Sequence, residues 1–209
     1  MPSKVDKKQD GKSLPRVVVV RRAVPERLCA NFSAAGSKLD LTVLETCPDE
    51  VHRTAGADDV PLDFELVSSE AFSISKIHSY LDQIKPDVLL CFGWADFCSL
   101  ASLTWAKSNG RRVILSTNTS LHDYPRNATR EFLKARLVLA FDLVWTAGQR
   151  SAHYIQTLGF PKERIHIGGL NTFDLEHFDS GASAARASDE HVRTKLKLPE
   201  KFFLCSARL

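Results

Sequence analysis

The chain has 209 residues, of which 44% are hydrophobic and 25% are charged, and its net charge is +3. This composition is typical of a globular protein with one large core, and a complete two-domain enzyme would be cramped in this length. The first sixteen residues hold five basic and two acidic side chains, which account for the whole net charge. We therefore expect no nucleic-acid partner, because the body of the chain has no excess of basic residues.

The cysteines and the N-terminus indicate a reduced, cytoplasmic protein. Five cysteines, an odd number, form no CxxC pair, and Cys91 and Cys98 lie in apolar segments, so we expect reduced and buried thiols. No apolar run is long enough for a transmembrane helix, and the charged N-terminus lacks the apolar segment of a secretory signal. Zinc-binding, P-loop, kinase and Ser-hydrolase motifs are also missing from the sequence.

The first third of the chain predicts short strands around one helix. Residues 1–15 are polar, and we predict a disordered tail. A helix is predicted at 24–36, with Gly36 as its C-terminal cap. Three apolar runs of strand length lie at residues 16–22, 41–44 and 64–67. No GxGxxG motif follows the first run, so we expect no dinucleotide site there. The acidic segment 46–63 is predicted to be a surface loop.

From residue 68 to residue 178 the sequence alternates between helix and strand patterns. A helix capped by Ser68 or Ser69 is predicted to end at Lys85, because the residue before proline avoids the helical region. Further strands are predicted at residues 87–92, 112–116, 143–146 and 164–167, and further helices at residues 95–107, 128–141 and 149–158. Among the side chains predicted to point inward are Phe97, Phe132 and Leu133. Such alternation predicts an α/β fold, a Rossmann-like parallel sheet with helices on both faces.

The last thirty residues have a different composition. Residues 180–188 are small and polar and are predicted to form a linker. A short charged helix is expected at 189–198, and an apolar strand at 201–209. We therefore predict a Rossmann-like domain at 16–178, followed at 179–209 by a linker, a helix and the first strand of an incomplete second domain.

Polar side chains gather directly after the predicted strand at 112–116. In open α/β sheets, ligands bind in the crevice beyond the carboxyl ends of the strands. There Ser116 and Asn118 could hydrogen-bond a hydroxylated ligand, although both could equally serve as polar caps of the loop. His122 and Asp123 could form a general base with an orienting carboxylate, although a histidine in such a loop is often merely solvated.

A second group of candidates lies at the start of the helix predicted at 149–158. Backbone amides beginning at Gly148, together with Arg150, could hold an anion. A turn glycine followed by a solvated arginine explains the same residues. We interpret His153 and His166 as structural, since their spacing does not fit a metal site, and Trp94 and Trp105 as core residues.

The C-terminal half resembles the family-four glycosyltransferases of the two-domain GT-B type, through an ordered set of short motifs. The matching residues are Leu158-Gly159, residues 164–167, Asn171-Thr172-Phe173-Asp174, Phe178, Leu198-Pro199 and Ala207-Arg208-Leu209. Two features depart from the family pattern: no glycine-rich turn follows the first strand, and Ala207 replaces the usual glycine.

The resemblance implies two facing Rossmann-like domains. The first binds the acceptor, and the second binds a nucleotide-sugar donor, usually without a metal, with retention of anomeric configuration. No cofactor is implied, since the nucleotide sugar is a co-substrate. Arg208 matches the arginine that meets the donor diphosphate. On the acceptor side the family has a histidine that aligns with Asn118, and we assign His122, Asp123 and Arg126 to the same region.

These observations favour the acceptor-binding part of a hexosyltransferase, truncated and inactive without its donor domain. The acceptor would be a sugar or a lipid-linked sugar. One alternative is a non-catalytic Rossmann-like binding or scaffold module, and another is an enzyme assembled with a separate donor-domain chain. The helix at 128–141, with Arg130, Lys134 and Arg136, permits shallow contact with a membrane surface, and a solvated helix face explains it as well.

Overall fold

The fold was taken from a computed structural model, which describes residues 8–9, 12–25, 28–47, 62–68, 72–94, 96–123, 125–169, 175–187, 189–197, 199, 201 and 203. The chain divides into two compact units, Met1–Thr172 and Phe173–Leu209. Each unit is described by itself.

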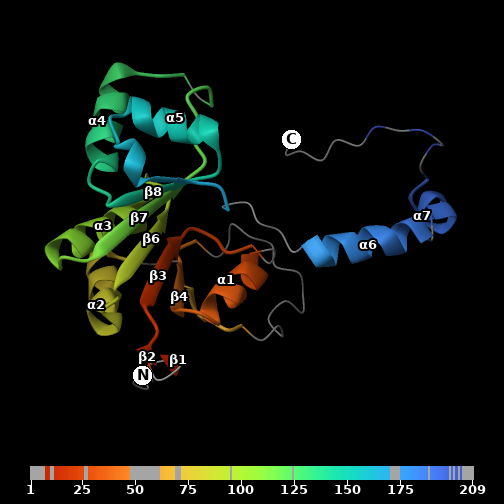
Figure 1. The fold of residues 1–209 in the computed structure, drawn as a ribbon, viewed down its shortest axis with the longest axis horizontal. Helices are drawn as coiled ribbons and strands as arrows, with labels where there is room; N and C mark the ends of the chain where they lie inside the picture. Colours follow the sequence, from red (N-terminus) through yellow and green to blue (C-terminus); the bar gives the residue numbers. More distant parts are fainter. Residues whose placement is uncertain are drawn as a thin grey trace. The chain divides into compact units, whose positions relative to one another are not determined.

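The first unit is built on a parallel sheet of seven strands in the order β5-β4-β3-β6-β7-β8-β9 (Figure 1). The strands are β3 (Arg16–Arg21), β4 (Asp40–Glu45), β5 (Glu65–Ser68), β6 (Val88–Phe92), β7 (Arg112–Thr117), β8 (Leu143–Thr146) and β9 (Ile165–Ile167). The chain leaves β5 at one edge and returns beside β3, so the order of the strands reverses between β3 and β6. In doubly wound sheets this reversal opens a crevice at the carboxyl ends of the two strands.

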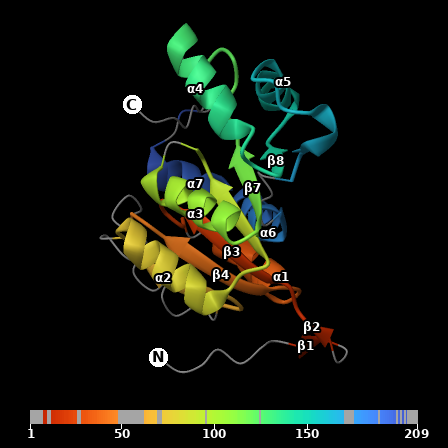
Figure 2. The same ribbon diagram turned by 90° about the vertical axis from the view of Figure 1, so that its left-hand side faces the viewer.

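Helices cover both faces of the sheet, as the sequence predicted (Figure 2). They are α1 (Cys29–Gly36), α2 (Ile74–Ile84), α3 (Phe97–Ser108), α4 (Ala128–Val138) and α5 (Gln149–Thr157), with a short 3-10 helix at Lys162–Arg164. On one face Val18, Leu89 and Leu115 lie in a large buried cluster with residues of α2, α3 and α5. On the other face Val19 and Val43 form a smaller cluster with Phe32 of α1.

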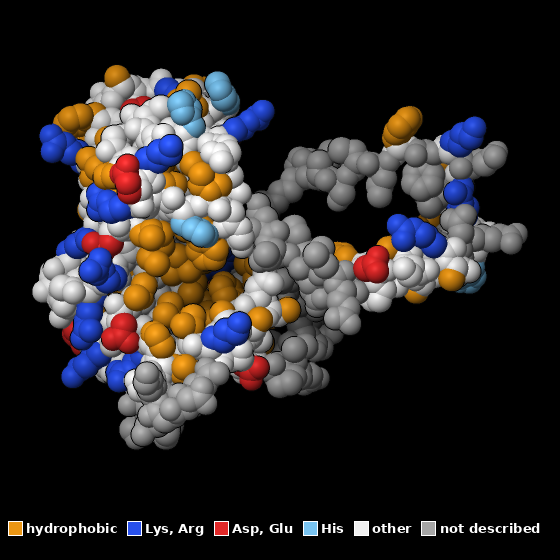
Figure 3. All heavy atoms as spheres, in the orientation of Figure 1, with side chains coloured by type: hydrophobic (Ala, Val, Ile, Leu, Met, Phe, Trp, Pro, Cys, Tyr) orange, Lys and Arg blue, Asp and Glu red, His pale blue; other side chains and the backbone are white. Residues whose placement is uncertain are grey.

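The face covered by α1 is less completely buried than the opposite face. Leu90, Ile114 and Leu143 are register partners on neighbouring strands, and all three are only half-buried, as are Phe92 and Trp145. Figure 3 shows hydrophobic side chains gathered in the region where Figure 1 draws β3, β6 and β7. Part of the apolar surface of the sheet therefore remains accessible beside α1.

Two of the predicted helix caps need correction. The cap of α2 is Ser73, whose side chain accepts a hydrogen bond from the Lys76 amide at 3.2 Å, whereas Ser68 ends strand β5 and Ser69 lies outside the described residues. Gly36 is the last residue of α1, and the cap is Ser37. A Cβ at Gly36 would lie 2.2 Å from the carbonyl oxygen of Asp63. Close approach of the backbone, rather than a left-handed cap, therefore explains the glycine.

Three apolar side chains predicted to point inward do not do so. Phe97 is 49% exposed, Phe132 is 60% exposed and Leu133 is 61% exposed. Phe97 is the first residue of α3, beyond the part of the helix that packs on the sheet. In α4 the sequence shows no single apolar stripe, and Val138 is its one buried residue among the eleven. The prediction for this segment is therefore wrong for Phe132 and Leu133, whereas Leu137 and Phe141, which were also predicted to point inward, do pack against the core.

The ends of the chain also differ from the expectation. In the tail predicted to be disordered, β1 (Lys8–Gln9) pairs antiparallel with β2 (Lys12–Ser13). Most of the predicted linker at 180–188 lies in helix α6 (Leu175–Ala187), whose alanines favour helix, and α7 (Asp189–Leu196) follows. Of the predicted strand at 201–209, residues 201 and 203 lie outside any strand and the others, with Arg208, lie outside the described residues.

Candidate functional site

The carboxyl ends of β7 and β8 lie side by side and carry several of the predicted site residues. Ser116 pairs in register with Trp145, and the last residues of the two strands pair with each other. The hydroxyl of Ser151, in the first turn of α5, donates to the backbone oxygen of Asn118 at 2.9 Å. The structure therefore brings Ser116, Asn118 and the start of α5 to one edge of the sheet.

Ser116 occupies an unusual position for a hydroxyl group. The residue is 3% exposed, and its Oγ is buried without a hydrogen-bond partner among the described residues. Its register neighbours are Phe92 on one side and Trp145 on the other. An unsatisfied buried hydroxyl destabilises a fold by about 1–3 kcal/mol. A polar group bound beside Ser116 would offset this penalty.

The start of α5 has the features of an anion-binding turn, though by itself it defines no site. Gly148 is the N-terminal cap and makes no side-chain cap hydrogen bond. Its φ of −173° is extended backbone, and a Cβ at this position would meet no atom within 4 Å. The fold itself therefore does not require glycine there. Arg150 is exposed in the first turn of the helix.

His122 and Asp123 are both exposed, and the hydrogen bonds of Asp123 go elsewhere. One carboxylate oxygen accepts from the Ser120 amide at 2.7 Å, and the other accepts from the Ser120 hydroxyl at 2.6 Å. These two bonds are the main reason that the pKa of Asp123 lies below its usual value, with smaller contributions from the charges of Arg126 and His122. Asp123 therefore closes a turn, and its role in orienting His122 stays a prediction.

Arg126 holds the loop that follows β7. Its Nε donates to the Leu121 carbonyl at 2.9 Å, and Nη2 donates to the Ser120 carbonyl. Nη1 donates to the Tyr154 hydroxyl at 2.9 Å, and the guanidinium lies 4.3 Å from the centre of that ring. Since most of its donors are used within the protein, Arg126 is better suited to positioning the loop than to contacting an acceptor.

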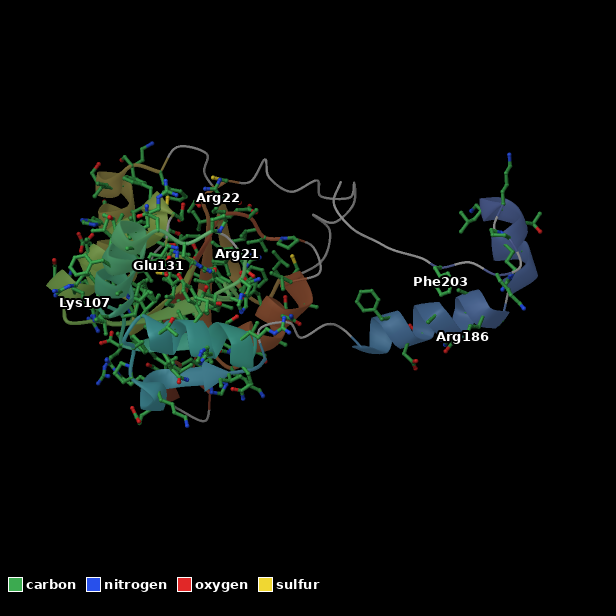
Figure 4. All side chains as sticks on the ribbon, turned by 90° about the horizontal axis from the view of Figure 1, so that it is seen from above. Arg21, Arg22, Lys107, Glu131, Arg186 and Phe203 are labelled. Atoms are coloured by element: carbon green, nitrogen blue, oxygen red, sulfur yellow. The ribbon has the colours of Figure 1, made fainter. Side chains whose placement is uncertain are left out.

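A polar network joins the loop to α4 and α5. The fully buried Tyr154 donates its hydroxyl proton to Glu131 at 2.8 Å. The same carboxylate pairs with Lys134 at 2.9 Å and with Arg126 at 3.4 Å (Glu131 is labelled in Figure 4). This network was not predicted from the sequence. The available signal was that Glu131 is the one acidic residue of α4.

The network shifts the pKa values of its two acidic groups, Tyr154 and Glu131. Burial raises the pKa of Tyr154, and its hydrogen bond to Glu131 and the charge of that carboxylate raise it further. Burial opposes the ionisation of Glu131, but hydrogen bonds from Lys134 and Tyr154, with the charges of Lys134 and Arg126, outweigh burial and lower its pKa. Tyr154 is therefore held neutral and Glu131 charged around neutral pH.

The reversal point of the sheet also carries charged residues that were not predicted as candidates. Arg21 ends β3, and Arg22 follows it (both are labelled in Figure 4). The Arg21 side chain donates to the Ala23 carbonyl at 2.7 Å and lies over the Phe92 ring, 4.6 Å from its centre. The fully buried Glu45 accepts from the Val24 amide at 2.7 Å. The signal in the sequence was the pair of arginines directly after a run of valines.

Comparison with known proteins shows what the fold is similar to. No protein-family model and no curated protein matches this sequence. UDP-N-acetylglucosamine 2-epimerase from Rickettsia bellii matches 89% of this chain and 52% of its own, with 17% identity and a TM-score of 0.55. The UDP-GlcNAc 2-epimerase from Methanocaldococcus jannaschii matches 72% of this chain and 44% of its own, with 14% identity and a TM-score of 0.51.

A third solved structure is Anabaena HepE in complex with UDP and glucose, which matches 73% of this chain and 44% of its own, with 12% identity and a TM-score of 0.51. At these identities the likeness shows the fold alone. This chain spans about half the length of the first of these proteins and less of the other two. The predicted Rossmann-like α/β fold is confirmed in the form of a GT-B-like half.

Of the predictions about cysteine and tryptophan side chains, some are confirmed in full and others in part. Cys91 and Cys98 are free and buried, and Cys29 and Cys47 are free but only partly buried. Trp105 is buried, and Trp94 packs partly buried against the core. None of the described helices is long and apolar enough to cross a membrane. Within the described ranges no three His, Cys, Asp or Glu side chains are grouped as metal ligands would be.

Proposed function

We propose that this chain is the acceptor-binding half of a retaining, nucleotide-sugar-dependent glycosyltransferase and is inactive without a donor-binding domain. The observation that carries the proposal is the assembly of Ser116, Asn118 and the start of α5 at the carboxyl edge of a GT-B-like sheet. The similar structures include a UDP-N-acetylglucosamine 2-epimerase and a protein in complex with UDP and glucose, which supports a nucleotide sugar as the donor. The motifs from Asn171 to Leu209 favour a transferase.

In this proposal the residues have distinct roles. Ser116 and Asn118 hydrogen-bond hydroxyl groups of a sugar or lipid-linked sugar acceptor, and Gly148 and Arg150 hold an anionic part of the ligand. The acceptor oxygen forms a bond to C1 of the donor sugar, while the bond between C1 and the diphosphate breaks and the nucleoside diphosphate leaves with the electron pair. His122 takes the proton of the acceptor hydroxyl, and Arg208 stabilises the leaving diphosphate.

Asp123 and Arg126 act indirectly in this scheme. Asp123 supports His122 through the turn that it closes with Ser120. Arg126 fixes the same loop from its other side, through the carbonyls of Ser120 and Leu121. Arg126 therefore positions the loop and does not itself contact the acceptor.

A second candidate function is half of a UDP-sugar epimerase. The two epimerases with TM-scores of 0.55 and 0.51 favour it, because their sheets are similar to this one. An epimerase has no separate acceptor, so this half would bind only the sugar of a nucleotide sugar. A non-catalytic binding module would also use the same edge, without any transfer.

The test is an NMR titration of the whole chain with methyl glycosides, UDP and UDP-GlcNAc, each added separately. We expect amide shifts at Asn118, Gly148 and Arg150 with at least one glycoside, and no sugar transfer in the absence of a donor domain. Asn118→Ala should abolish the response. Gln156→Ala, an exposed amide at the far end of α5, is the matched control and should leave it unchanged.

Each outcome decides between the candidates. A response to UDP-GlcNAc at this edge with none to any glycoside would overturn acceptor binding and favour the epimerase half. Substantial transfer of sugar to a glycoside by residues 1–209 alone would contradict the need for a donor domain. If the amide signals of this edge shift with none of the three kinds of ligand, the chain is a module without a sugar site. This result would also overturn the proposal.

A further inference from the structure

Helix α4 exposes large apolar side chains on its outer surface. Phe132 is 60% exposed, Leu133 is 61% exposed, and Leu139, just after the helix, is 42% exposed. On a helix of 3.6 residues per turn, Phe132 and Leu133 lie on the side away from Val138, which packs on the core. Exposure of two adjacent large apolar side chains to water is unfavourable. Grouped exposed apolar residues of this kind mark interaction sites.

The exposed charged side chains of α4 are both arginines. Arg130 and Arg136 are exposed on α4, and the Arg136 guanidinium lies 5.3 Å from the centre of the Phe132 ring. The one acidic residue of the helix, Glu131, turns inward and is neutralised by Lys134 and Arg126. We use the name outer face of α4 for five residues, namely Arg130, Phe132, Leu133, Arg136 and Leu139. This face therefore combines apolar groups with two arginines that form no ion pair with any described residue.

We propose that the outer face of α4 binds the surface of a bilayer that contains anionic lipids. Phe132 and Leu133 enter the boundary between headgroups and acyl chains, and the arginines meet the lipid phosphates. The contact is peripheral and involves one helix face. It stands apart from the proposed sugar chemistry, since none of its residues belongs to the carboxyl edge of the sheet.

A second copy of the chain fits this face less well than a bilayer does. Self-association through one face is usually symmetric, so the face would meet its own copy. The arginines of the two copies would then lie against each other, with no acidic residue in α4 free to compensate them. An anionic lipid surface supplies the opposite charge together with an apolar layer.

The test is flotation of the whole chain with two kinds of vesicles, one of phosphatidylcholine alone and one that also contains about 30% of the anionic lipid phosphatidylglycerol. We expect binding to the anionic vesicles that weakens as salt is raised. Arg130→Gln with Arg136→Gln should reduce partitioning roughly 25-fold, because each basic side chain near an anionic surface adds about fivefold. Phe132→Ser with Leu133→Ser should reduce it about tenfold or more.

The matched control is Ile74→Ser with Phe97→Ser, which removes apolar side chains of similar exposure, 50% and 49%, from α2 and α3. This variant should bind vesicles as the natural sequence does. Equal losses in the control, or no binding to anionic vesicles, would overturn the proposal. A dimer in light scattering that depends on Phe132 and Leu133, without vesicle binding, would identify a second copy as the occupant and would also overturn it. The saccharide titration is unaffected by either result.

Discussion

Helices α3 and α4 follow neighbouring strands and differ in length by a single residue, but different forces hold them. Seven residues of α3 are buried, including Leu103 and Trp105. In α4 only Val138 is buried, and the helix is tied to α5 and the preceding loop through Glu131 and Tyr154. Apolar burial along the whole helix fixes α3, whereas α4 packs on the core mainly through Val138, Ala135 and Leu137 and is also held by hydrogen bonds and ion pairs. This difference leaves the apolar side chains of α4 available for a partner.

The largest expected effect compares one leucine from each helix. Leu103 is 4% exposed and Leu133 is 61% exposed. Leu103→Ala should lower the free energy of unfolding by about 2–5 kcal/mol, because it leaves a cavity in the core. Leu133→Ala should change it by about 0.5 kcal/mol or less, as expected of a surface site. Urea unfolding followed by circular dichroism measures both, and similar losses would show that α4 is packed as α3 is.

A smaller effect is expected where α4 meets α5. Tyr154→Phe removes the hydroxyl that donates to Glu131 and accepts from Arg126. We expect the free energy of unfolding to fall by about 1–3 kcal/mol, because these charged partners lose a buried hydrogen bond. Tyr80→Phe is the control, since its hydroxyl makes a longer bond of 3.4 Å to Glu65 at an exposed position. Equal losses of stability in the two variants would show that the hydrogen bond between Tyr154 and Glu131 does not hold α4 in place.

The smallest expected effect is a dependence of stability on pH. The folded pKa of Glu131 is lowered, so its contribution is present above the unfolded value of about 4.3 and is lost as the pH falls through the folded pKa. Partly exposed ion pairs contribute about 0.2–1 kcal/mol. Stability measured from pH 6 to about pH 3 should therefore fall less steeply in Glu131→Gln than in the natural sequence.

The control for the pH experiment is Glu163→Gln, since Glu163 is exposed in the short helix before β9. This variant should keep the steeper fall of the natural sequence. If Glu131→Gln and Glu163→Gln gave the same curve, the ionisation of Glu131 would not stabilise the link between α4 and α5.

Much of the fold could be predicted because its signals are local. Strands β3, β6, β7 and β8 were found from apolar runs, and the end of α2 from Lys85-Pro86, where Lys85 adopts a left-handed φ of 51°. The edge of the sheet that carries Ser116 and Asn118 also followed from the sequence, since parallel strands place their carboxyl ends together. The linker predicted at 180–188 was wrong and helix α6 was missed, because a small-residue composition fits helix as well as coil.

The candidate site was predicted less completely, since its geometry depends on contacts between distant residues. The bond between Ser151 and Asn118 spans 33 positions, and that between Arg126 and Tyr154 spans 28. No pattern within one segment indicates such partners. Asp123 was assigned to His122 because the two are adjacent in sequence, whereas its oxygens bind Ser120.

For residues 16–167 the sequence by itself determined the order of strands and helices and the parallel sheet, because periodicity and helix breakers act within a few residues. Only the tertiary structure decided which side of α4 faces inward and that Arg126 positions a loop. It also decided that Gly36 is required by the carbonyl of Asp63. The physical reason is that burial and hydrogen bonding depend on what packs against a segment, and the packing partners come from other parts of the chain.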